Sequence, residues 1–145
     1  MGKKIIKVEA RTMDVRVLDL PEQFTAKWIA EQIGAEWIEI VRPVRANDFV
    51  MIVDEEGRLR DNMYVNTVAS WLYGSDKHGE VILGDCVLMM EEMGPEGPDL
   101  AGIDEFQAKK IQLQLDSEKS GMTMVLLTAL HGAGAAKKIM RGNEW

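Results

Sequence analysis

The chain has 145 residues, of which 46% are hydrophobic and 28% are charged, and its formal net charge at pH 7 is −7. These values are typical of one globular domain that can bury a core of its own. The negative charge, with the basic residues scattered along the chain, argues against direct binding of nucleic-acid phosphates.

Cysteine usage and the absence of long apolar runs bear on the compartment. Cys86 is the only cysteine, so no disulfide can form within the chain, which is typical of a reducing environment. No apolar run approaches the roughly 18 residues of a membrane span, and the N-terminal lysines lack the apolar run of a secretory signal. We therefore expect a cytoplasmic protein without membrane association.

The N-terminal quarter predicts a hairpin followed by a helix. Apolar residues favour strands at positions 5–8 and 13–17, with a turn at 9–12 between them. Apolar residues then recur at helical spacing over Glu22–Ile33, which Gly34 can end.

Two further strands are expected at positions 37–41 and 49–53. The acidic run Asp54–Gly57 that follows is typical of a turn, because glycine tolerates the positive φ that such turns need. A calcium loop would need alternate oxygen ligands and a glutamate at its twelfth position, and these are missing.

The second half of the chain is more varied. Residues 62–73 are consistent with a short helix or an irregular segment, and 74–79 with a polar loop. Residues 81–90 predict a buried strand interrupted at Gly84. Prolines and glycines make 91–102 a loop, and Asp104 can cap a helix that reaches Leu115.

In the last segment, Ser120–Trp145, residues Met122–Leu130 are apolar on almost every face of the helix that they would form. Such a helix must be buried on every side. The sequence therefore predicts an α+β domain over residues 1–119, and a C-terminal helical segment, 120–145, that packs on it or on a second subunit. The domain should hold a mostly antiparallel or mixed sheet of four or five strands with two or three helices. A homo-oligomer follows from the apolar segment.

No pattern in the chain predicts catalysis, a cofactor or a metal. His78 and His131 lie far apart and no short ligand spacing joins them to other metal-binding residue types. Residues 131–138 combine glycines with two lysines, but the spacing is not that of a phosphate-binding loop. Cys86 lies in an apolar strand pattern and is expected to be an inert core thiol.

The most suggestive stretch for function is Asn62–His78, flanked by Arg58 and Arg60, where aromatic and hydrogen-bonding side chains are dense. Loops with this composition often carry recognition. The alternative is that Trp71 packs into the core while the polar residues turn the chain. The predicted binding residues are Arg58, Arg60, Asn66, Trp71, Tyr73, Asp76 and His78.

An ordered series of short motifs runs through residues 33–41, 49–59, Asn66, 69–74 and 81–88. In this series the chain resembles a family of small uncharacterised proteins, a domain of unknown function, from phages, prophages, plasmids and actinobacterial or clostridial genomes. The resemblance covers Lys7–Gln112. Ala35 and Asp54 stand where the family prefers glycine and asparagine. The resemblance implies an origin in a mobile element and no known activity.

Two functions follow as hypotheses. The first is a non-catalytic binding protein of phage or mobile-element type, such as an antagonist of host defence, which binds a host protein or sequesters a signalling nucleotide in the host cytoplasm. The alternative is a small enzyme that acts on a phosphorylated or nucleotide substrate through His78, Asp76 and nearby arginines. A carboxylate within hydrogen-bond reach of His78 would favour the enzyme.

Overall fold

The computed structural model describes residues 2–59 and 63–129, with the side chain of Arg58 excepted. The predictions made for Arg60 and for residues 130–145, His131 included, lie outside the described residues.

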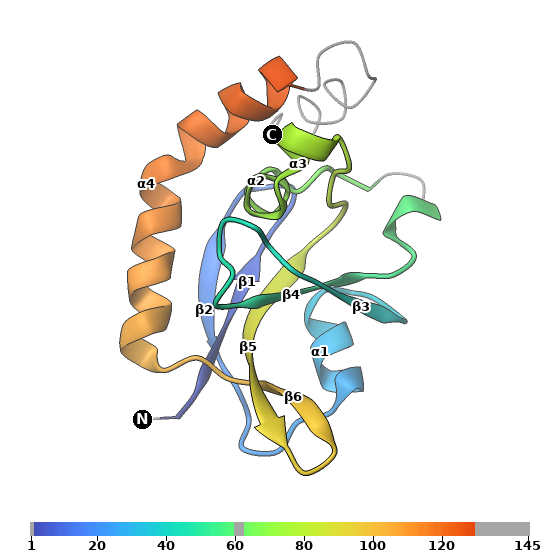
Figure 1. The fold of residues 1–145 in the computed structure, drawn as a ribbon, viewed down its shortest axis with the longest axis vertical. Helices are drawn as coiled ribbons and strands as arrows, with labels where there is room; N and C mark the ends of the chain where they lie inside the picture. Colours follow the sequence, from blue (N-terminus) through green and yellow to red (C-terminus); the bar gives the residue numbers. More distant parts are fainter. Residues whose placement is uncertain (1, 60–62, 130–145) are drawn as a thin grey trace.

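The described residues form an α+β fold, as predicted, in one domain built on an antiparallel sheet (Figure 1). The sheet has six strands where four or five were expected, and its main path runs β2-β1-β5-β4-β3, with β6 paired to β5. The strands are β1 (Lys4–Val8), β2 (Val15–Asp19), β3 (Ile38–Val41), β4 (Val50–Asp54), β5 (Cys86–Gly94) and β6 (Gly97–Ala101).

The predicted N-terminal hairpin is confirmed, because β1 and β2 pair along their whole length. Side-chain alternation divides the apolar residues between the two faces of the sheet. Ile5 packs with one cluster and its neighbour Ile6 with the other. The central strands β4 and β5 lie between the two clusters, which explains why their sequences are almost continuously apolar.

One face of the sheet is covered by α1 (Ala26–Gln32), whose Ile29 is buried against β4 and β5. The helix begins later than predicted because Thr25 caps it. The Thr25 hydroxyl accepts a hydrogen bond from the Trp28 N–H at 3.1 Å. Residues 22–25 therefore lead into the helix rather than belonging to it.

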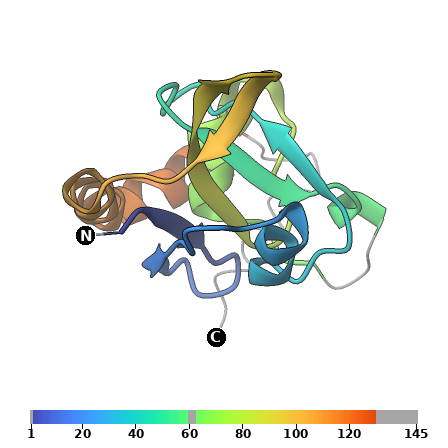
Figure 2. The same cartoon turned by 90° about the horizontal axis from the view of Figure 1, so that it is seen from below.

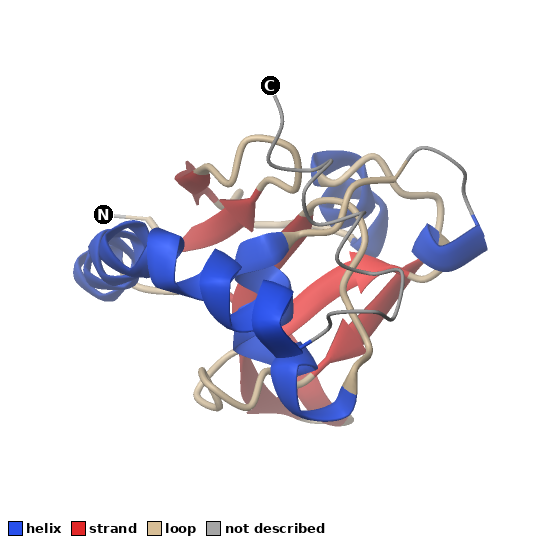
Figure 3. Ribbon diagram, turned by 90° about the horizontal axis from the view of Figure 1, so that it is seen from above, coloured by secondary structure: helices blue, strands red, loops and turns tan. Residues whose placement is uncertain are grey.

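The other face is covered by α2 (Thr67–Tyr73) and α4 (Glu105–Ala129), and the helices surround the sheet in Figure 3. The predicted loop at 74–79 is instead the single turn α3 (Ser75–His78). Gly74 has a φ of 88° between α2 and α3. Its left-handed conformation lets the chain leave one helix and enter the next within one residue.

The strand predicted at 81–90 begins later than expected, at Cys86. Gly84 has a φ of 84°, which is incompatible with a regular strand. This position therefore requires glycine, and β5 starts after it.

The loop predicted at 91–102 is wrong, because these residues form the hairpin of β5 and β6. Pro98 lies in β6, which pairs with β5 alone among the described strands. Proline is accepted in an edge strand because its missing N–H is not needed there. The prolines and glycines that predicted a loop are therefore part of a hairpin.

The helix predicted to end near Leu115 continues to Ala129 without interruption. Asp104 caps it as expected, since its side chain accepts from the Gln107 N–H at 2.8 Å. The buried side chains of α4 recur at heptad-like spacing on one face; they are Ala108, Leu115, Met122 and Leu126. Residues 120–129 therefore share a helix with 105–119 and pack on the domain. Within the described residues, no helix is both long and apolar enough to cross a membrane.

Candidate functional site at the edge of β3

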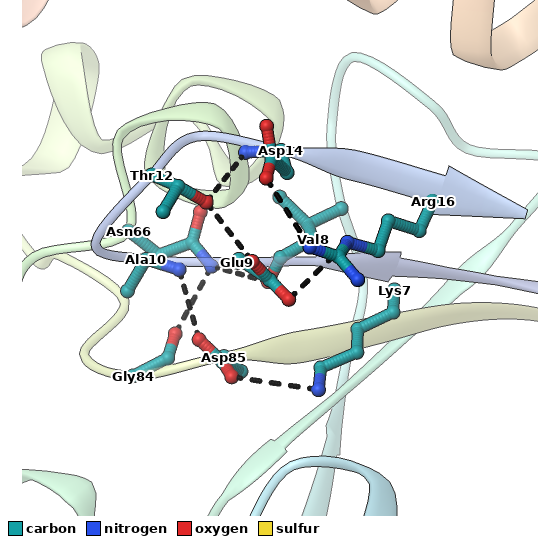
Figure 4. Close-up of polar contacts among 10 residues, drawn as sticks. All are labelled: Lys7, Val8, Glu9, Ala10, Thr12, Asp14, Arg16, Asn66, Gly84 and Asp85. Carbon is teal, nitrogen blue, oxygen red and sulfur yellow. Dashed lines mark hydrogen bonds and ion pairs between the residues drawn. The ribbon is translucent and has the colours of Figure 1, made fainter.

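Asn66 does not border an exposed site, because its side chain is completely buried. It caps α2 by accepting from the Ala69 N–H at 3.0 Å. Its amide nitrogen donates to the carbonyls of Val8 at 2.9 Å and Gly84 at 3.0 Å (Figure 4). The side chain thus joins β1, α2 and the segment before β5. Asn66 therefore has a structural role, and the expectation that it borders an exposed site is wrong, whereas its predicted role in binding stays a prediction.

The turn between β1 and β2 has a polar network of its own, next to Asn66 in Figure 4. The Thr12 hydroxyl donates to Glu9 at 2.9 Å, and Arg16 lies 3.4 Å from the same carboxylate. Asp85 accepts from the Ala10 N–H at 2.9 Å. These polar groups bond to one another and to the backbone, so we interpret the network as one that stabilises the turn between β1 and β2.

Asp76 and Trp71 are brought together by Arg45, a residue that sequence reasoning missed. Arg45 holds the Asp76 carboxylate through two hydrogen bonds of 2.6 and 2.8 Å. It also donates to the Trp71 carbonyl at 2.6 Å, and its guanidinium lies 4.8 Å from the centre of the Trp71 ring. Hydrogen bonding to Arg45 lowers the pKa of Asp76 below its usual value of 3.8. The cluster anchors the loop before β4 to α2 and α3.

His78 uses both of its ring nitrogens within the α3 turn. The Glu80 N–H donates to Nδ1 at 3.1 Å, so the ring proton of the neutral side chain lies on Nε2. Nε2 lies 3.2 Å from the Tyr73 carbonyl oxygen and donates to it. The Tyr73 ring meets the imidazole edge-on at a centroid distance of 4.8 Å. The Asp76 carboxylate is engaged by Arg45 and not by His78.

Arg58 lies in the 3₁₀ turn η1 (Gly57–Leu59), after β4. Of the seven predicted residues, Trp71, Tyr73, Asp76 and His78 thus gather on α2 and α3, whereas Asn66 is buried below them. Cys86 is buried, as expected, and burial raises the pKa of its thiol. Among residues 2–59 and 63–129, no three His, Cys, Asp or Glu side chains are placed to hold a metal ion.

A pocket of about 250 Å³ lies between Tyr73 of α2, the segment before β5, and strands β3 and β4. Tyr73, Val41 and Val53 contribute aromatic and apolar walls, and Glu39 and Glu55 are exposed acids at its lining. Among the described residues, neither of these two carboxylates takes part in an ion pair. We refer to this cavity as the acidic pocket. Its chemistry suits a cationic group with an apolar stem.

The outer edge of β3, beside the acidic pocket, has no partner strand in the described part of the chain. The Trp37 carbonyl accepts from the Glu55 N–H at 3.0 Å, and residues 39 and 41 face β4 in the same register. Because bonded and non-bonded pairs alternate in antiparallel sheets, the backbone groups of Ile38 and Ile40 point away from β4. Figure 2 shows β3 at the rim of the sheet. We call these groups the β3 edge.

Exposed apolar side chains flank the β3 edge. Trp37, directly before the strand, is 62% exposed, and Ile40 is 44% exposed. Alternation places Glu39 and Val41 on the pocket face of β3 and Ile40 on the α1 face. The strand therefore presents an acidic face and an apolar face on either side of a row of free backbone groups.

No family model, curated protein or solved structure matches this chain. The resemblance to the uncharacterised mobile-element family remains a prediction, and the fold and the site geometry carry the functional argument.

Proposed function

We propose that this protein is a non-catalytic binding module that adds an extended, basic segment of a partner protein to the β3 edge. The observation that carries the proposal is the coincidence of a free strand edge with the acidic pocket. In this mode of recognition, main-chain hydrogen bonds provide affinity, and pockets for alternate side chains provide specificity.

The alternation of an added strand matches the two faces of β3. Backbone groups of the segment would bond to those of Ile38 and Ile40. Its side chains would then point alternately toward the acidic pocket, beside Glu39, and toward the exposed side chain of Ile40. A segment in which cationic and apolar residues alternate therefore fits both faces.

Charge distinguishes this proposal from the other hypotheses. Glu39 and Glu55 would repel the phosphates of a signalling nucleotide, whereas they attract lysine or arginine side chains. The enzyme alternative depended on His78, whose ring nitrogens both face backbone groups. A protein partner is therefore favoured, and it would be a host protein if a mobile element encodes the chain. We propose the cytoplasm as the location, because the single cysteine suits a reducing compartment.

The test uses two fluorescent hexapeptides, one of alternating lysine and valine and one of alternating glutamate and valine. Fluorescence anisotropy is expected to show that the lysine peptide binds at least about tenfold more tightly, because like charges oppose the other peptide. Binding of the lysine peptide should weaken as ionic strength rises from about 0.05 M to about 0.5 M. Equal affinity for the two peptides would overturn the proposal.

Proline substitution separates strand addition from simple charge attraction. Ile40→Pro removes an N–H that points away from β4, so the sheet should persist while peptide binding falls about tenfold or more. Glu39→Pro is the matched control, because the N–H that it removes faces β4 and its loss should disturb the fold itself. An Ile40→Pro variant that keeps its native circular dichroism and binds the peptide normally would exclude the β3 edge.

A further inference from the structure

The outward face of α4 carries three large apolar side chains. Phe106 is 81% exposed, Leu113 is 69% exposed and Met124 is 65% exposed. Their spacings of 7 and 11 residues correspond to about two and three helical turns, so all three lie on one face. This face is opposite the one that carries Leu115 and Met122 into the core. We call it the outer stripe.

Small residues lie between Leu113 and Met124 on the same stripe. Ser117, Ser120 and Gly121 are exposed, and a Cβ at Gly121 would meet nothing within 4 Å. Together with Met124 they stand at positions i, i+3, i+4 and i+7. Four residues with this spacing form the hole that accepts one side chain of a facing helix.

We propose that the outer stripe binds α4 of a second copy of this chain, with the two helices antiparallel. In the register we assign, Phe106 of each copy enters the hole formed by Ser117, Ser120, Gly121 and Met124 of the other. The same register places Leu113 beside its own mate, next to the two-fold axis. Phe106 and Leu113 of the outer stripe thus each meet a complementary site on the partner, as an isologous interface requires.

Charge complementarity favours the antiparallel order. Lys109 and Asp116 lie on the same flank of the outer stripe, so in this register Lys109 of one copy faces Asp116 of the other. Asp116 already holds Lys119 of its own helix through Oδ1 at 2.8 Å, and its second oxygen can accept from Lys109. A parallel pair would instead set Lys109 of one copy against Lys110 of the other and would leave Phe106 without its hole.

This interface differs in extent from the one expected from the sequence, where residues 120–145 were to join the subunits. Met122 and Leu126 face the core, so the described part of that segment contributes Ser120, Gly121 and Met124. In Figures 1 and 2, α4 and β3 lie on opposite sides of the domain. A dimer through α4 would therefore leave both β3 edges accessible.

Light scattering of the full chain tests the proposal directly. The wild type is expected to have twice the 16.3 kDa mass of the single chain. Leu113→Glu places two like charges beside the axis and should give the single-chain mass. Thr128→Glu adds the same charge to an exposed site on the stripe, beyond the end of the facing helix, and should leave the dimer intact. A monomeric wild type, or a dimer that survives Leu113→Glu, would overturn the proposal.

Cross-linking tests the register. The only native cysteine, Cys86, is buried, so an introduced thiol reports on the surface. Leu113→Cys should form a dimer disulfide under mild oxidation. Ser120→Cys should not, because antiparallel helices separate the two thiols by about 20 Å along the axis. Efficient cross-linking of Ser120→Cys would show a parallel pair and would rule out the assigned register.

Discussion

Replacement of Asn66 by alanine is expected to lower the free energy of unfolding by about 3–7 kcal/mol, because one buried side chain makes three hydrogen bonds. Loss of a helix cap costs about 1 kcal/mol. The carbonyls of Val8 and Gly84 would each lose a buried donor, which adds about 1–3 kcal/mol apiece when no water replaces it. Urea denaturation measures the loss.

Asn47 provides the matched control for Asn66. It is exposed, so Asn47→Ala should change the free energy of unfolding by less than about 0.5 kcal/mol. Asn66→Asp keeps an acceptor for the Ala69 N–H but loses the two donated bonds, so it should still be strongly destabilising. If Asn66→Ala and Asn47→Ala had equal effects, the structural role assigned to Asn66 would be wrong.

Asn66 illustrates why a polar residue in a suggestive stretch can be misread. Its neighbours in sequence include aromatic and charged residues, which favoured recognition. Its hydrogen-bond partners are 58 and 18 positions away, at Val8 and Gly84. Only the packing of β1 against the segment before β5 brings these carbonyls to the amide. Asparagine as a helix cap could have been expected from the helical reading of residues 62–73, but its burial could not.

The elements that local physics dictates were predicted well. Alternation located β1 and β2, and Gly34 and Asp104 marked a helix end and a helix start. The β6 hairpin was missed because Pro98 is accepted only at an edge, and edge position is a property of the assembled sheet. The length of α4 was missed because apolar residues lie on both its buried and its exposed face, so the sequence shows no single helical period over the whole helix.

The candidate site was predicted only in part, for a related reason. Tyr73 does line the acidic pocket, but Glu39 and Val41 come from β3, which sequence reasoning treated only as part of the sheet. The β3 edge exists because β3 is the last strand of the order β2-β1-β5-β4-β3. Alternation identifies strands and does not order them, so a free edge cannot be read from it.

Arg45→Ala is expected to lower the free energy of unfolding by about 1–3 kcal/mol at pH 7. Removal of one partner from a buried ion pair costs about 3–5 kcal/mol, and the 26% exposure of the Arg45 side chain reduces this. The Asp76 side chain is only 6% exposed and would lose both hydrogen bonds from the guanidinium. Chemical denaturation of the variant and the wild type measures the difference.

The contribution of the Arg45–Asp76 pair to stability should depend on pH. Hydrogen bonding to Arg45 lowers the pKa of Asp76 in the folded protein below its usual value of 3.8. The stabilisation is therefore fully present above the pKa of the unfolded chain and is lost as pH falls through the lower folded pKa. The stability gap between the wild type and Arg45→Ala should narrow below about pH 4. A gap that stays constant from pH 7 down to pH 2 would show that the ion pair is not its source.

Arg42→Ala is the control that separates the effect of burial from that of the ion pair itself. Arg42 holds Glu91 in the same two-bonded geometry, at 2.7 and 3.1 Å, but its side chain is 67% exposed. Water and salt screen such a pair, so Arg42→Ala should cost much less than Arg45→Ala. Added salt should reduce the Arg42 effect more than the Arg45 effect, because Asp76 is shielded by α2 and α3. Equal losses in the two variants would mean that the anchoring of the loop to Trp71 and Asp76 contributes nothing beyond a surface contact.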